Sequence, residues 1–486
     1  MRTLSRARDT LHFMARTPAN KRTLLLLTAT LLWGGLGLRT HQVWETRTDI
    51  HESLASDALP IYLSGAAVLD GGDPTQADAL IRAYERRNMG TGALFFSTLY
   101  PASVGAMVAP LARLPWADFL GTWRFLILLG AVLAGITGGL ASVRGPRAWL
   151  AAPLGGLVVM TGFPLLSQSL GLGQANLLIA GLVGLSILGL SRGWEIAAGG
   201  AAATGVALKL VPGLLFWPML WARRWRAVLA GAVTGGVLVA WTLSSVSLEA
   251  TVSGIMGTIR FQQGVYPDWM NRNPAPDWMV FLGALRGLPM GLLTLGVAGA
   301  ACFQSDATQR RPVMAASAAC AAAWLSVHAA AVGVFYGTLL LPALAYAVLW
   351  PLGEQTPRRA WMAVPLAVLP WLLHATILTG LADEPRMALL GMAVWAVCMS
   401  RLFYAAPPLA RRARLAAVAV IAGGLAMDGI RTVQGPSLPP LSGDGMEDMP
   451  QGHGAGVGGI GPDRNWNPDM PERMPGQDAS PEQHAQ

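Results

Sequence analysis

A single lysine lies inside a long hydrophobic stretch of this chain, at position 209. The other lysine, Lys21, lies in the basic N-terminal segment, and arginine supplies the remaining 33 of the 35 positive side chains. Two amide side chains, Gln174 and Asn176, stand at the start of a preceding apolar run. Ionisable groups are costly in hydrocarbon, so a lysine there is a candidate for a functional residue. The alternative is a lysine that extends its ammonium group to a membrane interface.

The composition indicates a membrane protein. The 486 residues are 53% hydrophobic and only 13% charged, and the mean hydropathy is +0.44. The net charge of +8 arises from short arginine segments between apolar runs, which is typical of cytoplasmic loops and argues against nucleic acid as a partner. The three cysteines show no CxxC or Cys/His spacing, and the acidic residues form no ligand pattern. The sequence therefore predicts no disulfide, metal site or cofactor.

The apolar runs predict an all-α polytopic membrane protein with about 11 to 13 transmembrane helices. The candidate spans are 23–40, 118–141, 148–168, 175–191, 195–222, 227–246, 288–303, 313–331, 333–351, 361–380, 387–405 and 413–433. Residues 1–22 form a basic N-terminal tail, and 23–433 form the transmembrane domain. Residues 434–486 are rich in Gly, Pro, Asp and Met, so we expect them to be disordered.

The positive-inside rule predicts the topology. The basic segments expected in the cytoplasm are the N-terminal tail, Arg144/Arg147, Arg192, Arg223–Arg226, Arg310/Arg311, Arg358/Arg359 and Arg411–Arg414. The run 101–115 then cannot cross the membrane fully, and 195–222 must enter and return near Pro212. Residues 41–117 become a long outer loop with amphipathic helical pieces around Tyr62. The loop 247–287 and the C-terminal tail fall on the same outer side.

Four segments, in this order, resemble glycosyltransferase family 87, which comprises bacterial membrane enzymes of the GT-C fold. The segments are Asp57–Pro74 with its Gly71–Gly72 turn, Leu99–Tyr100–Pro101 leading to Ala109–Leu111, Gly173–Asn176 followed by Lys209–Pro212, and Leu325–His328 with Leu341–Pro342. The chain departs from the family pattern at Ala102, at Met270–Asn273 and at Ala329.

The resemblance implies a membrane glycosyltransferase of the inverting type. Its donor would be a polyprenyl-phosphate hexose, such as mannose, and its acceptor a glycolipid or glycan at the outer face of the bacterial inner membrane. The enzyme would lie among membrane lipids, and Asp57 would act as its catalytic base. The other implied roles are donor phosphate binding by Lys209 and His328, and substrate binding by Tyr62, Tyr100, Gln174 and Asn176.

Each of these residues also has a simpler interpretation. Asp57 precedes an apolar helical pattern and could be a helix N-cap, with Asp49 and His51 as rival bases. Asp70 and Asp73 fit the Gly-Gly turn, and His328 and His374 fit ordinary positions in or near helices. The amides could join helices, and the tyrosines, with Trp269, could belong to an interfacial aromatic belt.

Two other functional classes remain open from the sequence. A transporter or flippase of a lipid-linked substrate would share the apolar composition. In a structural or assembly protein, the C-terminal tail would suit partner binding. No Asp-x-Asp pair or Gly-rich phosphate loop occurs in a cytoplasmic segment, which favours a lipid-linked donor over a nucleotide sugar.

Overall fold

The computed structural model describes residues 19–48, 57–89, 100–145, 147–162, 166–262, 277–304, 310–329, 338–353 and 384–405. In these ranges every regular element is a helix. Among the described helices, three are long and apolar enough to cross a membrane: Thr23–Glu45, Trp116–Ser142 and Trp225–Ser245. The chain is an all-α membrane protein.

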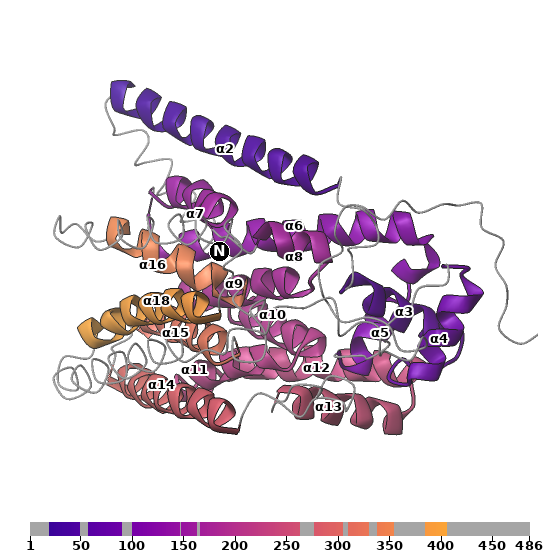
Figure 1. Cartoon of the computed structure of the whole chain (residues 1–486). Coiled ribbons are helices and arrows are strands. Elements are labelled where there is room, and N and C mark those ends of the chain that lie inside the picture. Colours follow the sequence, from indigo (N-terminus) through magenta and orange to yellow (C-terminus); the bar gives the residue numbers. More distant parts are fainter. Residues whose placement is uncertain are drawn as a thin grey trace, which may run out of the picture. The chain divides into compact units, whose positions relative to one another are not determined.

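The first part of the chain contains one long helix and several short ones (Figure 1). They are α2 (Ala19–Thr48), α3 (Ala58–Leu69), α4 (Ala77–Arg86), α5 (Ala102–Val108) and η2 (Leu111–Arg113). The predicted helix around Tyr62 is confirmed as α3, but its predicted amphipathic character is wrong. Because α3 packs on α4, α5, η2 and α6, its residues from Ile61 to Ala67 are all buried. The short α3, α4 and α5 lie together at the right of Figure 1.

The bundle combines long helices with a few short ones. They are α6 (Trp116–Ser142), α7 (Ala148–Gly162), α8 (Leu166–Leu172), α9 (Asn176–Arg192), α10 (Glu195–Leu208), η3 (Val211–Leu215), α11 (Phe216–Trp221), α12 (Trp225–Ser245), α13 (Leu248–Gln262), α14 (Asp277–Gln304), α15 (Arg310–Ala329), α16 (Leu341–Gly353) and α18 (Glu384–Ala405). Helix α6 packs against α7, α9 and α16. A Cβ atom on Gly135 of α6 would lie 2.5 Å from the carbonyl oxygen of Gly155 in α7. Small residues thus allow close approach where no water drives helix association.

The segment 195–222 turns back on itself, as predicted from its length and its proline. Helix α10 ends at Leu208, and η3 and α11 run from Val211 to Trp221. Arg224, just beyond this segment, donates a hydrogen bond from Nη1 to Glu195 Oε1 at 2.8 Å, so the two ends of the segment meet. Lys209 therefore lies at the far end of a helical hairpin.

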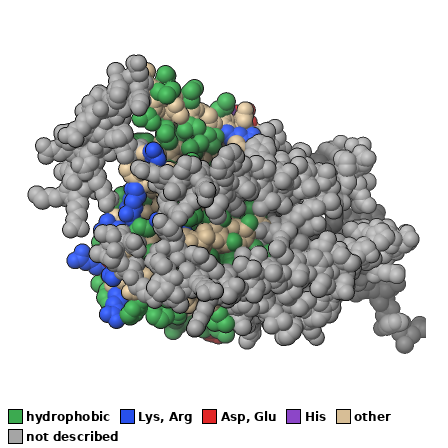
Figure 2. Space-filling model, turned by 90° about the vertical axis from the view of Figure 1, so that its left-hand side faces the viewer, with side chains coloured by type: hydrophobic (Ala, Val, Ile, Leu, Met, Phe, Trp, Pro, Cys, Tyr) green, Lys and Arg blue, Asp and Glu red, His purple; other side chains and the backbone are tan. Residues whose placement is uncertain are grey.

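Arginine side chains close the opposite end of the bundle. Arg192 donates hydrogen bonds to the carbonyl oxygens of Leu140 at 2.6 Å and Val143 at 3.0 Å. Arg144 donates one to Ser191 O at 3.2 Å, so the C-terminal ends of α6 and α9 are joined. Figure 2, a view onto the left side of Figure 1, shows Lys and Arg side chains there among hydrophobic ones. The arginines predicted for the cytoplasmic loops between these helices gather at one end.

Several predicted boundaries are wrong. Helix α2 extends beyond 23–40 in both directions, and 148–168 splits into α7 and α8. The loop 247–287 contains α13 and the first turns of α14.

Residues 101–115 contain only α5, seven residues long, and η2; at about 1.5 Å per residue α5 is too short to span a bilayer. The spans 361–380 and 413–433, residues 1–18 of the N-terminal tail, the C-terminal tail, Asp49, His51, Trp269 and His374 lie outside the described residues.

Candidate functional site

Asp57 occupies the N-cap position of α3 but does not act as a cap. Its side chain makes no capping hydrogen bond to the helix. Instead the carboxylate accepts a hydrogen bond from Gln174 Nε2, a residue 117 positions further along the chain. The backbone N–H of Asp57 donates to Leu172 O at 3.1 Å, which holds the start of α3 against the turn after α8. The aspartate is therefore committed to a tertiary contact.

The turn that carries Gln174 is fixed by side chains of α6. Trp123 donates a hydrogen bond from Nε1 to Gly173 O at 2.8 Å, and Arg124 donates one from Nη2 to Gly171 O at 3.1 Å. Gly173 has φ +74°, and a Cβ atom there would lie 2.5 Å from the Cβ atom of Ala58. Only glycine fits this left-handed position so close to α3.

Lys209 joins the same group of side chains from the end of α10. It is the C-cap residue, with extended backbone angles, and only 7% of it is exposed. Its Nζ donates a hydrogen bond to Asn176 Oδ1 at 3.1 Å, and Asn176 Nδ2 donates to Gln174 Oε1 at 3.2 Å. Together with the bond from Gln174 to Asp57, these contacts form a polar relay of Lys209, Asn176, Gln174 and Asp57.

Every hydrogen bond of the polar relay is donated in the same direction, from the ammonium group toward the carboxylate. Such chains polarise one another in a low-dielectric environment. Burial raises the pKa of Asp57 from 3.8 to about 6, and the Lys209 charge and the Gln174 hydrogen bond oppose that rise. The carboxylate is thus ionised at neutral pH but more basic than an exposed aspartate. A carboxylate with this pKa is suited to general base catalysis.

Tyr100 adjoins the polar relay, whereas Tyr62 does not. The Lys209 ammonium lies 5.8 Å from the centroid of the Tyr100 ring, a cation–π distance. Tyr62 is buried against Trp116 and Phe119, and its hydroxyl donates to Leu114 O at 3.2 Å. The structure thus brings together five of the seven predicted site residues.

His328 lies in the last turn of α15, and its side chain is outside the described residues. Leu325, one turn earlier, lines a small apolar cavity with Val211 and Pro212 of η3. The helix that carries His328 therefore packs on the segment that follows Lys209.

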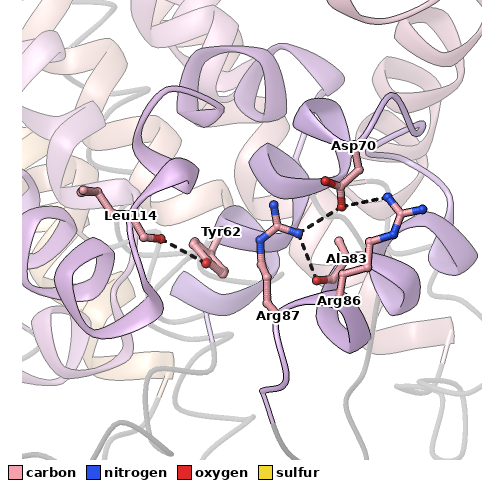
Figure 3. Close-up of polar contacts among 6 residues, drawn as sticks. All are labelled: Tyr62, Asp70, Ala83, Arg86, Arg87 and Leu114. Atoms are coloured by element: carbon pink, nitrogen blue, oxygen red, sulfur yellow. Dashed lines mark hydrogen bonds and ion pairs between the residues drawn. The ribbon is translucent and has the colours of Figure 1, made fainter.

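The two aspartates assigned to the Gly-Gly turn have structural contacts there. Asp73 Oδ1 accepts hydrogen bonds from the Thr75 N–H at 2.8 Å and the Thr75 hydroxyl at 2.7 Å. Asp70 forms ion pairs with Arg87 at 3.0 Å and Arg86 at 3.4 Å. Figure 3 shows Asp70 between these two arginines, with Tyr62 on the far side of Arg87. Within the described residues, no group of three or more His, Cys, Asp or Glu side chains could hold a metal ion.

Sequence reasoning missed the two residues of α6 that support the site, Trp123 and Arg124. Arg124 is only 5% exposed in a predominantly apolar helix. Its presence eight residues after Trp116, inside a predicted span, was the signal that could have identified it. The arginines around Tyr62 were also missed, because no period or spacing connects α4 with η2.

Residues 98–325 match the family model described as Glycosyltransferase family 87. This match supports a family 87 glycosyltransferase. The matched region includes Tyr100, Gln174, Asn176 and Lys209, while Asp57 and His328 lie outside it. No curated protein and no solved structure matches the chain. The family match and the apolar helices together indicate a membrane glycosyltransferase, which uses a sugar donor and an acceptor.

Proposed function

We propose that this family 87 enzyme transfers a hexose, with mannose as the first candidate, from a polyprenyl-phosphate donor to a glycolipid or glycan. The observation that carries the proposal is the polar relay, which connects one buried carboxylate to one buried ammonium group through two amides. Glycosyl transfer from a phosphate needs a base for the acceptor and a cation for the leaving group. The relay supplies both on a rigid support.

In the proposed step, Asp57 takes the proton of the acceptor hydroxyl as its oxygen attacks the anomeric carbon of the donor. The bond from that carbon to the phosphate oxygen breaks, and its electron pair leaves with the phosphate. Lys209 stabilises the charge that develops on that oxygen. Attack opposite to the leaving group inverts the anomeric configuration. Protonated Asp57 then releases its proton to water.

The roles of the remaining residues follow from their places. Gln174 and Asn176 fix the orientation of the carboxylate and the ammonium group, and Tyr100 forms an aromatic wall beside Lys209. His328 is a second donor to the leaving phosphate. Within the described residues, Gln174 is the one side chain that hydrogen-bonds to Asp57, and it uses one carboxylate oxygen. The other oxygen is then the acceptor for the incoming hydroxyl.

The proposal includes an orientation in the bacterial inner membrane and the GT-C fold with 11 to 13 spans. The arginine-closed end faces the cytoplasm, by the positive-inside rule. The polar relay lies at the opposite end of α9, a helix of 17 residues, which corresponds to about 25 Å at 1.5 Å per residue. This separation supports a site at the outer face, where a polyprenyl-phosphate donor would present its sugar.

A transfer assay tests the proposal directly. The purified full-length chain in lipid nanodiscs is incubated with radiolabelled polyprenyl-phosphate mannose or glucose and a membrane glycolipid extract. We expect label to move to the acceptor fraction with the wild type and not with Asp57→Asn. Movement of intact donor across a sealed vesicle membrane, without sugar transfer, would instead establish a flippase and refute the proposal.

A further inference from the structure

A hollow in the structure carries positive charge and is separate from the polar relay. Its volume is about 700 Å³, and it opens where the end of α3 meets α4 and the segment 112–116. Its charged lining consists of Arg86, Arg87, Arg113 and Asp70, and its aromatic lining of Tyr62 and Trp116. Three arginines against one aspartate give a net charge of +2. We call this site the arginine hollow.

The charges of the arginine hollow are only partly compensated. Asp70 is shared between Arg86 and Arg87, at 3.4 and 3.0 Å (Figure 3). Arg87 is held further by a hydrogen bond to Ala83 O at 3.2 Å, with its guanidinium 6.0 Å from the centre of the Tyr62 ring. Arg113 forms no ion pair with any residue that the structure describes. The hollow therefore combines the preorganised guanidinium group of Arg87 with the cations of Arg86 and Arg113.

Aromatic packing fixes the distance between the arginine hollow and the polar relay. Tyr62 contacts Trp116 and Phe119, with ring centroids 5.3 and 4.8 Å apart, and Phe119 stacks on Trp123 at 6.0 Å. Trp116 lines the hollow, while Trp123 holds the turn of the relay. The two residues are seven positions apart in α6, about 10 Å along the helix. The hollow lies beyond the relay, away from the arginine-closed end of the bundle.

We propose that the arginine hollow binds a phosphate group of the acceptor, at a distance from the hydroxyl that reacts at Asp57. A phosphate offers oxygen atoms in several directions, so guanidinium groups from α4 and η2 can bind it together. The aromatic wall of Tyr62 and Trp116 suits the faces of adjoining sugar rings. An acceptor bound at both places has its hydroxyl oriented before reaction. The acceptor is then an anionic glycolipid; this assignment rests on the proposed function, whereas the phosphate site itself does not.

Binding is measured first, without turnover. The full-length chain with Lys209→Met, which removes the proposed site for the donor phosphate, is placed in phosphatidylcholine nanodiscs and titrated calorimetrically with glycerol 1-phosphate. We expect Arg113→Gln and Arg86→Gln each to weaken binding about tenfold, equivalent to about 1.4 kcal/mol. Arg226→Gln, an exposed arginine at the start of α12, is the matched control and should leave binding unchanged. Equal binding by all variants would overturn the phosphate site.

Two further measurements decide what carries the phosphate. Phosphatidylglycerol added to the nanodiscs should leave glycerol 1-phosphate binding unchanged; competition would assign the hollow to bulk lipid headgroups and overturn the acceptor assignment. In the transfer assay, with Lys209 intact, Arg113→Gln should raise KM about tenfold for a phosphate-bearing acceptor with kcat unchanged. For an acceptor with its phosphate removed, KM should be the same for the wild type and the variant. An equal loss for both acceptors would refute the acceptor role.

The two proposals fail separately. Phosphate binding that depends on Arg113 in a chain without transfer activity would overturn the proposed function alone. Transfer that depends on Asp57, combined with phosphate binding that ignores Arg113, would overturn the arginine hollow alone.

Discussion

Substitution of Asp57 by asparagine should lower activity and raise stability at the same time. Asparagine keeps the size of the side chain but cannot take a proton from the acceptor. Loss of a general base typically costs at least about a hundredfold in rate. We therefore expect kcat for sugar transfer to fall by at least about a hundredfold, or about 2.7 kcal/mol of barrier.

The stability effect follows from the pKa of the carboxylate, which burial raises from 3.8 to about 6 in the folded chain. The folded state holds this proton more tightly than the unfolded state. Its contribution to folding is therefore fully present below pH 3.8 and is lost as the pH rises toward 6. The loss at pH 8 is about 3 kcal/mol at most, since one pKa unit corresponds to about 1.4 kcal/mol. Asp57→Asn avoids this loss, so its unfolding midpoint should exceed that of the wild type at pH 8 but not at pH 4.

Thermal unfolding of the full-length chain in detergent, followed by tryptophan fluorescence at both pH values, measures the second effect beside the transfer assay. Asp78→Asn is the control, because Asp78 is an exposed carboxylate in the first turn of α4. The control should keep wild-type activity. An Asp57→Asn variant with wild-type turnover would refute the base assignment, and a midpoint shift that is the same at pH 4 and pH 8 would refute the buried carboxylate. Should Asp49→Asn abolish turnover instead, Asp49 is the base.

Three other perturbations test the support of the site. Lys209→Met should reduce kcat/KM for the donor about 10- to 100-fold, the range of one hydrogen bond to a charged group. The Lys209 charge lowers the pKa of Asp57, so its removal should move the acidic limb of the pH–rate profile to higher pH. An acidic limb at the wild-type pH would contradict the polar relay. Gly173→Ala should lower the unfolding midpoint, since a residue with a side chain at φ +74° costs about 1–2 kcal/mol. Gly121→Ala is the control and should leave the midpoint unchanged, because nothing lies within 4 Å of the added atom. Equal midpoints for the two variants would exclude the tight turn. Single cysteines in place of Gln76 and Arg226 should react with an impermeant thiol reagent from the outer and the cytoplasmic side respectively, and the reverse pattern would invert the proposed orientation.

The membrane class and much of the local structure were predictable from the sequence. The helices α6, α9 and α12 begin within two residues of the predicted spans, because a helix in lipid must be apolar over a length set by the bilayer. The hairpin at 195–222 was predictable for a similar reason, since the segment is too long to cross once and contains Pro212. The chemical character of Lys209 was visible because a charge among apolar residues stands out at any position.

The family resemblance, confirmed by the match over residues 98–325, also came from local order along the chain. The motifs are short, and their order along the chain can be read without knowledge of tertiary contacts. The resemblance could not distinguish a capping aspartate from a functional one, since both interpretations fit Asp57 before an apolar helix. In the structure the side chain makes no capping hydrogen bond to α3 and instead accepts one from Gln174, so the capping interpretation is wrong.

By itself the sequence determined which residue types are available and which stretches are helical, because hydropathy and backbone propensity act over a few turns of chain. Only the tertiary structure decided which of these residues meet. The bond from Gln174 to Asp57 joins positions 117 apart, and the one from Lys209 to Asn176 joins positions 33 apart. The arginine hollow likewise needs α4 and η2 both to pack on α3. Such meetings depend on the close packing of small residues between helices and on the need of buried polar groups for partners, which no local pattern encodes.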